Sequence, residues 1–202
     1  MPPVSNALRR RGDRDSDPAF ERLLSAATDL FGREGFAASS LDAVAAAAGV
    51  TKGSLYHHFR GKAELFEAVF ERHAAAQAER VGSIAARKRD PWQVAYAGVR
   101  AFLDESQDPA MQRIMLMDGP SVLGWDRMRE IEAQYGLALI KAVLGQLVES
   151  GQIRRHDVDV LAHLLFGALT EGALVIAGAE DTAAAVRTVE RELRRMIDGL
   201  AA

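Results

Sequence analysis

Apolar side chains recur at spacings of three and four along most of the chain, whereas runs of alternating β-branched or aromatic residues are scarce. Such spacing places the apolar residues on one face of a helix, so the pattern predicts an all-helical, all-α protein. Capping residues, prolines and glycines mark where the helices start and stop. The predicted helices cover residues 17–35, 39–49, 51–58, 62–84, 91–105, 109–118, 124–150, 157–178 and 182–200.

Two short helices joined by a tight turn are predicted between residues 39 and 59. A helix-turn-helix needs a small residue where its helices touch, a tight turn, and apolar residues that hold the second helix down. These requirements are met by Ala45, Gly49, Val50, Leu55 and Phe59. The outer face of the second helix then carries hydrogen-bond donors, which are Thr51, Lys52, Ser54, His57 and His58. Such a face is typical of a helix that enters the major groove of DNA and contacts base edges and phosphates.

The net charge of −3 is unusual for a nucleic-acid-binding protein until it is divided along the chain. Residues 1–62 contain nine Lys and Arg against seven Asp and Glu, a net of +2, which leaves −5 for the remainder. No acidic residue lies between positions 50 and 62, where Lys52, Arg60 and Lys62 accompany Tyr56 and two histidines. DNA phosphates interact with the charges close to them rather than with the net charge of the protein, so this segment is compatible with DNA binding.

Four stretches within residues 18–70 form a recognisable pattern. They are Leu23 to Gly35, Ser39-Ser40-Leu41-Asp42-Ala43-Val44-Ala45, Gly49-Val50-Thr51-Lys52-Gly53-Ser54-Leu55-Tyr56-His57-His58-Phe59, and Lys62-Ala63-Glu64-Leu65. This pattern resembles the TetR family of bacterial transcriptional regulators. The resemblance implies an all-helical homodimer, an N-terminal three-helix DNA-binding domain, and a C-terminal domain that binds a small effector. Most such proteins are repressors that their ligand releases from a palindromic operator.

The resemblance also implies which residues contact double-stranded operator DNA. They are Ser40, Thr51, Lys52, Gly53, Ser54, Tyr56, His58 and Lys62. We add His57 from the outer face of the recognition helix. Gly61 stands where the family more often has Ser, Asn or Asp, which weakens the expected helix cap. Arg9, Arg10 and Arg11 are either a minor-groove arm or a disordered tail.

The resemblance and the helix pattern together predict three parts of the chain. Residues 1–16 form a flexible basic N-terminal arm, residues 17–75 the DNA-binding domain with its helix-turn-helix at about 39–59, and residues 76–202 a helical bundle for effector binding and dimerisation. The apolar stripes of the last two long helices are expected to pair with those of a second copy around a two-fold axis. The predicted interface residues are Leu161, Leu164, Leu165, Ala168, Leu169, Gly172, Val189, Leu193, Met196, Ile197 and Leu200.

The segment from Met111 to Tyr135 is rich in methionine and aromatic residues. Each of these side chains taken alone fits a place in the core. As a group they would form an adaptable apolar lining, so we predict an effector pocket here for a small, largely apolar ligand. The predicted lining is Phe102, Met111, Met115, Trp125, Met128, Ile131, Tyr135, His163, Phe166, Thr170 and Glu171.

Catalytic, metal and cofactor sites find little support in the sequence. Cysteine is absent, which excludes disulfides and thiolate metal sites. Asp159 and His163 lie four residues apart, but no third ligand has convincing spacing, so we expect no metal. Residues 119–124 lack the spacing and the preceding strand of a nucleophile elbow, and neither a phosphate loop nor a dinucleotide fingerprint occurs. We therefore predict no cofactor and no enzymatic activity.

Two alternatives to a DNA-binding regulator remain open from the residues alone. One is a helical enzyme with an apolar pocket in its C-terminal domain. The other is an interaction protein that does not bind DNA, which would leave the acid-free segment 50–62 unexplained. No uninterrupted apolar stretch reaches the roughly 18 residues of a membrane span, and the N-terminal residues lack the apolar region of a secretion signal. The expected location is therefore the cytoplasm, with no membrane contact.

Overall fold

The structure, a computed structural model, describes residues 17–202, and the arm expected over residues 1–16 with Arg9, Arg10 and Arg11 lies outside this range. The described chain is all-helical, which confirms the predicted fold class. The helices are α2 (Pro18–Glu34), α3 (Leu41–Ala48), α4 (Lys52–His58), α5 (Lys62–Ala85), α6 (Pro91–Glu105), α7 (Pro109–Met111), the π-helix η1 (Gln112–Asp118), α8 (Gly119–Leu123), α9 (Trp125–Gln134), α10 (Gly136–Glu149), α11 (Val158–Ala177) and α12 (Thr182–Asp198).

Helix α2 begins at Pro18, beside the predicted start, whereas α3 begins at Leu41, two residues after its predicted start at residue 39. The carboxylate of Asp17 accepts a hydrogen bond from the backbone N–H of Ala19 (2.8 Å), and Pro18 occupies the first turn of α2. The hydroxyl oxygen of Ser40 caps α3 in the same way. Helix α5 begins after Gly61 without a side-chain cap, in agreement with the glycine at that position.

Two expected helices differ from those observed. Residues 124–150 form α9 and α10 rather than one helix, because the backbone leaves helical geometry at Tyr135 (φ −116°, ψ −91°). Gly136 follows this break, and a Cβ atom there would lie 2.9 Å from the ring of Phe166. The break therefore coincides with a close approach of α10 to α11. Residues 109–118 combine the short α7 with η1, and α8 follows directly.

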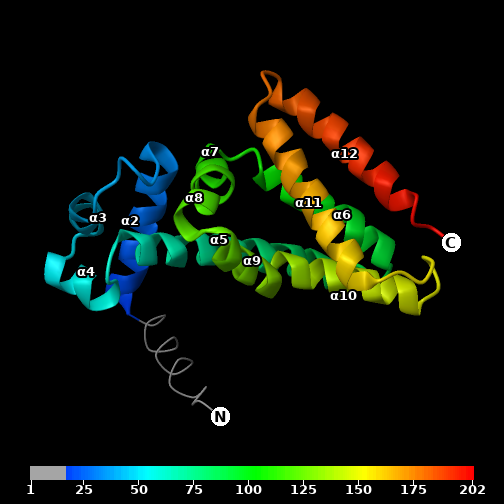
Figure 1. Cartoon of the computed structure of the whole chain (residues 1–202), viewed down its shortest axis with the longest axis horizontal. Helices are drawn as coiled ribbons and strands as arrows, with labels where there is room; N and C mark the ends of the chain where they lie inside the picture. Colours follow the sequence, from blue (N-terminus) through cyan, green and yellow to red (C-terminus); the bar gives the residue numbers. More distant parts are fainter. Residues whose placement is uncertain (1–16) are drawn as a thin grey trace, which may run out of the picture.

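Helix α5 connects the two ends of the molecule (Figure 1). Helices α2, α3 and α4 gather around its N-terminal half, whereas α6, α10, α11 and α12 form a bundle at the other end. In that bundle α10 packs on α11, α11 packs on α12, and α6 contacts α5, α10 and α12. Helices α7 to α9 lie between the two groups. The α3–α4 pair and the α11–α12 pair are consequently far apart.

The core around α2 to α5 also includes side chains from the middle segment. Ile114 of η1 and Ile131 of α9 are fully buried in it, and Met128 is 7% exposed. The carboxylate of Asp118 accepts a hydrogen bond from the backbone N–H of Phe36 (2.7 Å), although the two residues are 82 positions apart. The N-terminal helices are therefore packed together with residues of the segment that follows α6, and we call this joint hydrophobic cluster the shared core.

Gly119 offers a direct test of the shared core. A Cβ atom at this position would lie 2.7 Å from the ring of Phe70, which is buried, and 3.1 Å from the carbonyl oxygen of Ile114. We expect Gly119→Ala to lower the free energy of unfolding by about 1–3 kcal/mol, because neither neighbour can move aside without disturbing the core. Urea denaturation followed by circular dichroism measures this change.

Gly145 in α10 provides the matched control, since nothing lies within 4 Å of a Cβ atom placed there. Gly145→Ala should raise the free energy of unfolding by about 0.5–1 kcal/mol, because alanine loses less backbone entropy in a helix than glycine does. Equal changes in the two variants would show that α8 does not press tightly on α5.

Candidate functional site

The helix-turn-helix consists of α3, a turn at Gly49, and α4. Gly49 has φ 64° and ψ 35°, the left-handed conformation that glycine adopts most readily. Beneath the turn, Ala45, Leu55 and Phe59 are 3%, 1% and 2% exposed. Arg22 of α2 donates its Nε–H to the carbonyl oxygen of the last residue of α3 (3.2 Å). These contacts fix the angle at which α4 is presented.

One face of α4 is open to solvent. Tyr56 extends from it with 57% of its surface exposed, and Ser54 is half-buried beside it. The hydroxyl oxygens of Ser40 and Thr51 accept backbone hydrogen bonds as helix caps, so their O–H groups are available as donors. The exposed residues of α4 and its cap are Thr51, Lys52, Gly53, Tyr56 and His57. This face has the size and the donors that major-groove recognition needs.

His58 does not belong to this face, and the expectation that it is exposed is wrong. It follows Leu55 by three residues and therefore shares the buried face of α4. Its side chain is 7% exposed, and its Nε2 lies 3.3 Å from Oδ2 of Asp17. The ring of Phe20 packs edge-on against it, with centroids 5.8 Å apart. His58 thus packs the recognition helix against α2 through Asp17 and Phe20.

Lys62 holds the loop between α2 and α3. Its Nζ donates to the carbonyl oxygens of Phe36 (2.7 Å), Ala37 (3.3 Å) and Ser39 (2.9 Å). It also lies 4.4 Å from the centroid of the Phe36 ring. An ammonium group has three N–H donors, so each of them has a carbonyl partner here. The phosphate contact expected of Lys62 would require one of these bonds to be exchanged.

Lys52 stands at the exposed start of α4 and forms an ion pair with Asp42 at 2.6 Å. Both side chains are mostly exposed, at 67% and 62%. The hydrogen bond to Asp42 raises the pKa of Lys52 above its ordinary value. Asp42 therefore places a carboxylate beside the cation that DNA would meet, and a phosphate has to compete with it for Lys52.

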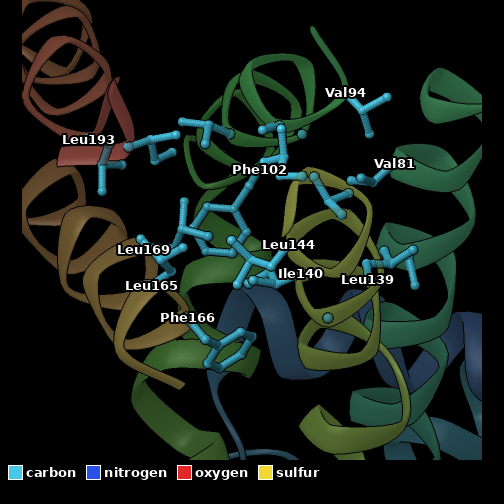
Figure 2. Close-up of a pocket in the computed structure, with 18 of the residues that line it drawn as sticks. Val81, Val94, Phe102, Leu139, Ile140, Leu144, Leu165, Phe166, Leu169 and Leu193 are labelled. Atoms are coloured by element: carbon cyan, nitrogen blue, oxygen red, sulfur yellow. The ribbon is translucent and has the colours of Figure 1, made fainter. Parts of the chain in front are cut away.

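An apolar cavity of ≈ 110 Å³ lies in the C-terminal bundle between α5, α6, α10, α11 and α12 (Figure 2). Figure 2 shows Phe102 of α6 and Leu165 of α11 directed toward its centre from different helices. Its lining is hydrocarbon apart from the amide of one glutamine. The lining residues are Gln77, Ala78, Val81, Val94, Ala95, Gly98, Val99, Phe102, Gly136, Leu139, Ile140, Val143, Leu144, Leu147, Leu165, Phe166, Leu169, Leu193, Ile197 and Leu200.

The effector pocket expected from the sequence differs from this cavity. Of the predicted lining, Phe102 and Phe166 belong to it. Met128 and Ile131 instead lie in the shared core, and Trp125 is 62% exposed. The adaptable composition of the methionine-rich segment predicts a pocket, but the position of the segment between the two ends of the molecule places Met128 and Ile131 in a core.

The other predicted pocket residues are dispersed. His163 and Glu171 are exposed on α11, and Thr170 donates its hydroxyl to the carbonyl oxygen of the residue four positions earlier. Tyr135 lines a groove beside α2 and α5. Met111 and Met115 line a second, polar cavity. Sequence reasoning missed the α5 and α10 sides of the apolar cavity. The small residues Ala78 of α5 and Ala95 and Gly98 of α6 are the signal that could have indicated this lining.

Nine of the eleven residues predicted at the dimer interface are buried or partly buried against other side chains of the same chain. Leu164 and Met196 are the exceptions, with 65% and 55% of their surface exposed. Gly172 is buried, and a Cβ atom there would lie 2.7 Å from the side chain of Val189. A helix as apolar as α11 presents several apolar stripes, so spacing alone does not identify the outward one. The inward residues are Leu161, Leu165, Ala168, Leu169, Gly172, Val189, Leu193, Ile197 and Leu200.

Helix α11 is long and apolar enough to cross a membrane by length and composition alone, with 20 residues and a mean hydropathy of 1.9. Only 22% of that window is buried. The helix nevertheless packs on α6, α10 and α12 of the bundle. A single helix of this kind is weak evidence for a membrane span. An exposed apolar patch of this kind also marks protein–protein interfaces.

These features define a helix-turn-helix DNA-binding protein whose second part is a helical bundle with an apolar cavity. Residues 23–69 match the family model described as "Bacterial regulatory proteins, tetR family". Residues 92–200, more than half of the chain, match the model described as "Tetracyclin repressor-like, C-terminal domain". The chain therefore belongs to the TetR family, and it is a DNA-binding transcriptional regulator.

Individual relatives agree with this assignment. The chain is 28% identical over 151 residues to the TetC protein of transposon Tn10 from Escherichia coli, which covers 73% of this chain and 75% of that protein. It is 38% identical over 96 residues to the transcriptional activator FasR of Mycolicibacterium smegmatis, covering 47% and 44%. The crystal structure of a TetR-family regulator from Pectobacterium atrosepticum superposes with a TM-score of 0.81 at 31% identity, covering 95% and 97% of the two chains.

The Lys52–Asp42 pair yields a prediction for DNA binding. We expect Asp42→Asn to strengthen binding to operator and to unrelated DNA by about two- to fivefold, because Lys52 becomes free and one carboxylate no longer repels the phosphates. Fluorescence anisotropy with a labelled duplex, repeated at several salt concentrations, measures the change.

The matched control is Asp29→Asn, which removes the same charge from an exposed position of α2 outside the helix-turn-helix. It should leave DNA affinity unchanged. If both variants gained affinity equally, the effect would come from net charge, and the Lys52–Asp42 pair would have no particular role.

Proposed function

We propose that this protein is a ligand-released repressor that binds a palindromic operator as a homodimer. The observation that carries the proposal is the path of α5. Its first residue, Lys62, bonds to the loop before α3, and residues Gln77, Ala78 and Val81 near its other end line the apolar cavity. One continuous helix thus joins the DNA-reading element to the cavity, so a change in the cavity has a direct mechanical route to α4.

The cavity favours an effector that is small and largely apolar. Its lining offers hydrocarbon on every side and a single amide, that of Gln77, whose Nε2 donates to Glu105 (2.9 Å). A volume of ≈ 110 Å³ is close to that of cavities that accept one benzene-sized ring. A larger ligand therefore has to push α5, α6 and α10 apart, which supplies the differential interaction that release from DNA requires.

The outward face of α11 supports a homodimer. Val160, Leu164, Leu174 and Val175 are 41% to 65% exposed and lie along one side of the helix with the exposed Gly167. Together with the exposed Glu171, which lies in the middle of this face, they follow the four-and-three spacing of a helix–helix seam. A two-fold axis through this face would bury the same surface on both copies, since an isologous interface is self-complementary.

Such a dimer accounts for a palindromic operator and for release. Two recognition helices must lie about 34 Å apart to enter successive major grooves. A ligand that moves α5 in each protomer changes this separation, so ligand and DNA bind in opposition through one coupling free energy, typically about 1–3 kcal/mol. Repression then follows when the occupied operator overlaps a promoter.

A cavity-filling substitution tests release without knowledge of the natural effector. Ala95→Phe places a ring in the apolar cavity, and we expect it to weaken binding to the DNA upstream of the gene by about five- to 150-fold. Anisotropy measures the affinity, and a reporter driven by that DNA should be repressed by the wild type and released by the variant.

Ala142→Phe, at an exposed position of α10, is the control and should bind DNA like the wild type. A folded Ala95→Phe variant with wild-type affinity would contradict the coupling. Reporter expression that rises in the presence of the wild type would identify an activator instead of a repressor.

The dimer face has its own test. We expect Leu164→Glu to convert the dimer to a monomer of 21.9 kDa, because each copy would bury an unpaired carboxylate against the same surface of its partner. Sedimentation equilibrium measures the mass. Met117→Glu introduces the same charge at a position that is 55% exposed on η1, and it should remain dimeric. A dimeric Leu164→Glu variant would move the interface elsewhere.

A further inference from the structure

A second cavity, of ≈ 330 Å³, lies where α2, α5, the end of α6, α7 and η1 meet. It shares Gln77 with the apolar cavity and is otherwise built from different residues. Thr28 of α2 and Met111 at the end of α7 stand on different sides of it. Its volume falls at the lower end of the range of about 300–1,000 Å³ found for small-molecule sites.

The charged groups around this second cavity are already paired. Arg80 forms an ion pair with Glu105, which also accepts a hydrogen bond from the amide of Gln77 (2.9 Å). Arg72 lies 3.4 Å from both Glu21 and the hydroxyl of Thr28. Asp108, the remaining charged lining residue, caps α7 through the backbone N–H of the residue two positions on. A charged ligand would have to compete with one of these ion pairs or hydrogen bonds, so the cavity favours an uncharged one.

His73 supplies the polar group that these pairs leave unused. Its Nε2 is buried and has no hydrogen-bond partner among residues 17–202. Burial, reinforced by the neighbouring Arg72, lowers the pKa of His73, so its imidazole is neutral at neutral pH. A neutral imidazole nitrogen forms one hydrogen bond, either as donor or as acceptor. A buried polar atom without a partner is unfavourable, so a ligand that bonds to Nε2 gains from satisfying it.

Two thioether side chains give the cavity an apolar side. Met111 is 7% exposed and Met115 is half-buried, and both line the cavity. Methionine sulfur and methyl groups make favourable contacts with aromatic rings and adapt to their outline. The combination of an unpartnered imidazole with two methionines suits a flat apolar body that carries one hydroxyl group.

We propose that this cavity is a second ligand site, for a small uncharged aromatic compound whose hydroxyl group bonds to Nε2 of His73 and whose ring lies against Met111 and Met115. The site does not depend on the apolar cavity being an effector pocket. It borders α2 of the DNA-binding helices through Thr28. Nearby, α2 and α7 approach so closely that a Cβ atom at Gly32 would lie 2.5 Å from Cβ of Ala110. An occupant would therefore contact α5 through His73 and alter the packing of α2 against α5 and α7.

Phenol is the probe that tests this proposal, with toluene as the matched compound that lacks the hydroxyl. The full-length protein is labelled with ¹³C at its methionine methyl groups, and each compound is titrated while the methyl spectrum is recorded. We expect saturable shifts of the Met111 and Met115 methyls with phenol, while those of Met128 and Met196 stay in place. Toluene should bind at least fivefold more weakly.

Two variants assign the hydrogen bond. His73→Leu should weaken phenol binding at least fivefold and leave toluene binding unchanged, whereas His73→Gln, which keeps a hydrogen-bonding group, should retain at least half of the wild-type affinity. Absence of saturable shifts at Met111 and Met115 would overturn the proposal, since water alone would then satisfy His73. Equal phenol affinity in wild type and His73→Leu would overturn it as well.

Discussion

The packing of η1 and α9 against the DNA-binding helices is the constraint on which the rest of the structure depends. Ile114 and Ile131 are fully buried among the side chains of α2 to α5, and the carboxylate of Asp118 accepts the backbone N–H of Phe36. The loop at Phe36 is in turn held by Lys62. The helix-turn-helix is therefore packed together with residues at least 55 positions further along the chain, and α2 to α4 share one core with η1 and α9.

This shared core explains how a short reading element communicates with a distant bundle. Helix α5 links α4 to the apolar cavity, and η1 with α9 links the same α2–α5 core to α10 and α11. Interiors are densely packed, so a displacement on either route is passed on rather than absorbed. The polar cavity beside His73 lies where the two routes meet, because α5, α7 and η1 all border it. The proposed response of the protein to a ligand therefore depends on the packing of its core more than on a hinge.

The sequence predicts those parts of the fold that local rules determine. The cap at Asp17 and the turn at Gly49 depend on residues within a few positions of one another, and the structure has both, whereas α3, expected from residue 39, begins at Leu41 after Ser40 as its cap. The site residues are harder to predict, because the burial of a side chain depends on which segment of the folded chain packs against it. His58 lies on the inner face of α4 against Phe20, and Met128 fills the shared core, though its residue type equally suits a pocket. Helix α11 is apolar apart from Asp159, His163, Thr170 and Glu171, so the spacing of its apolar residues does not separate its outward face from its core face.

Native-state hydrogen exchange tests the shared core most directly, through the variant Ile114→Ala, which removes a fully buried side chain of η1. Amides of α2 should lose as much protection as those of α9, about 2–5 kcal/mol, because both depend on one cooperative core. Leu144→Ala, in the cluster beneath α10 and α11, should instead lower protection there and spare α2. Unchanged protection of α2 in Ile114→Ala would contradict a single shared core, since the DNA-binding helices would then fold independently of the segment that packs on them.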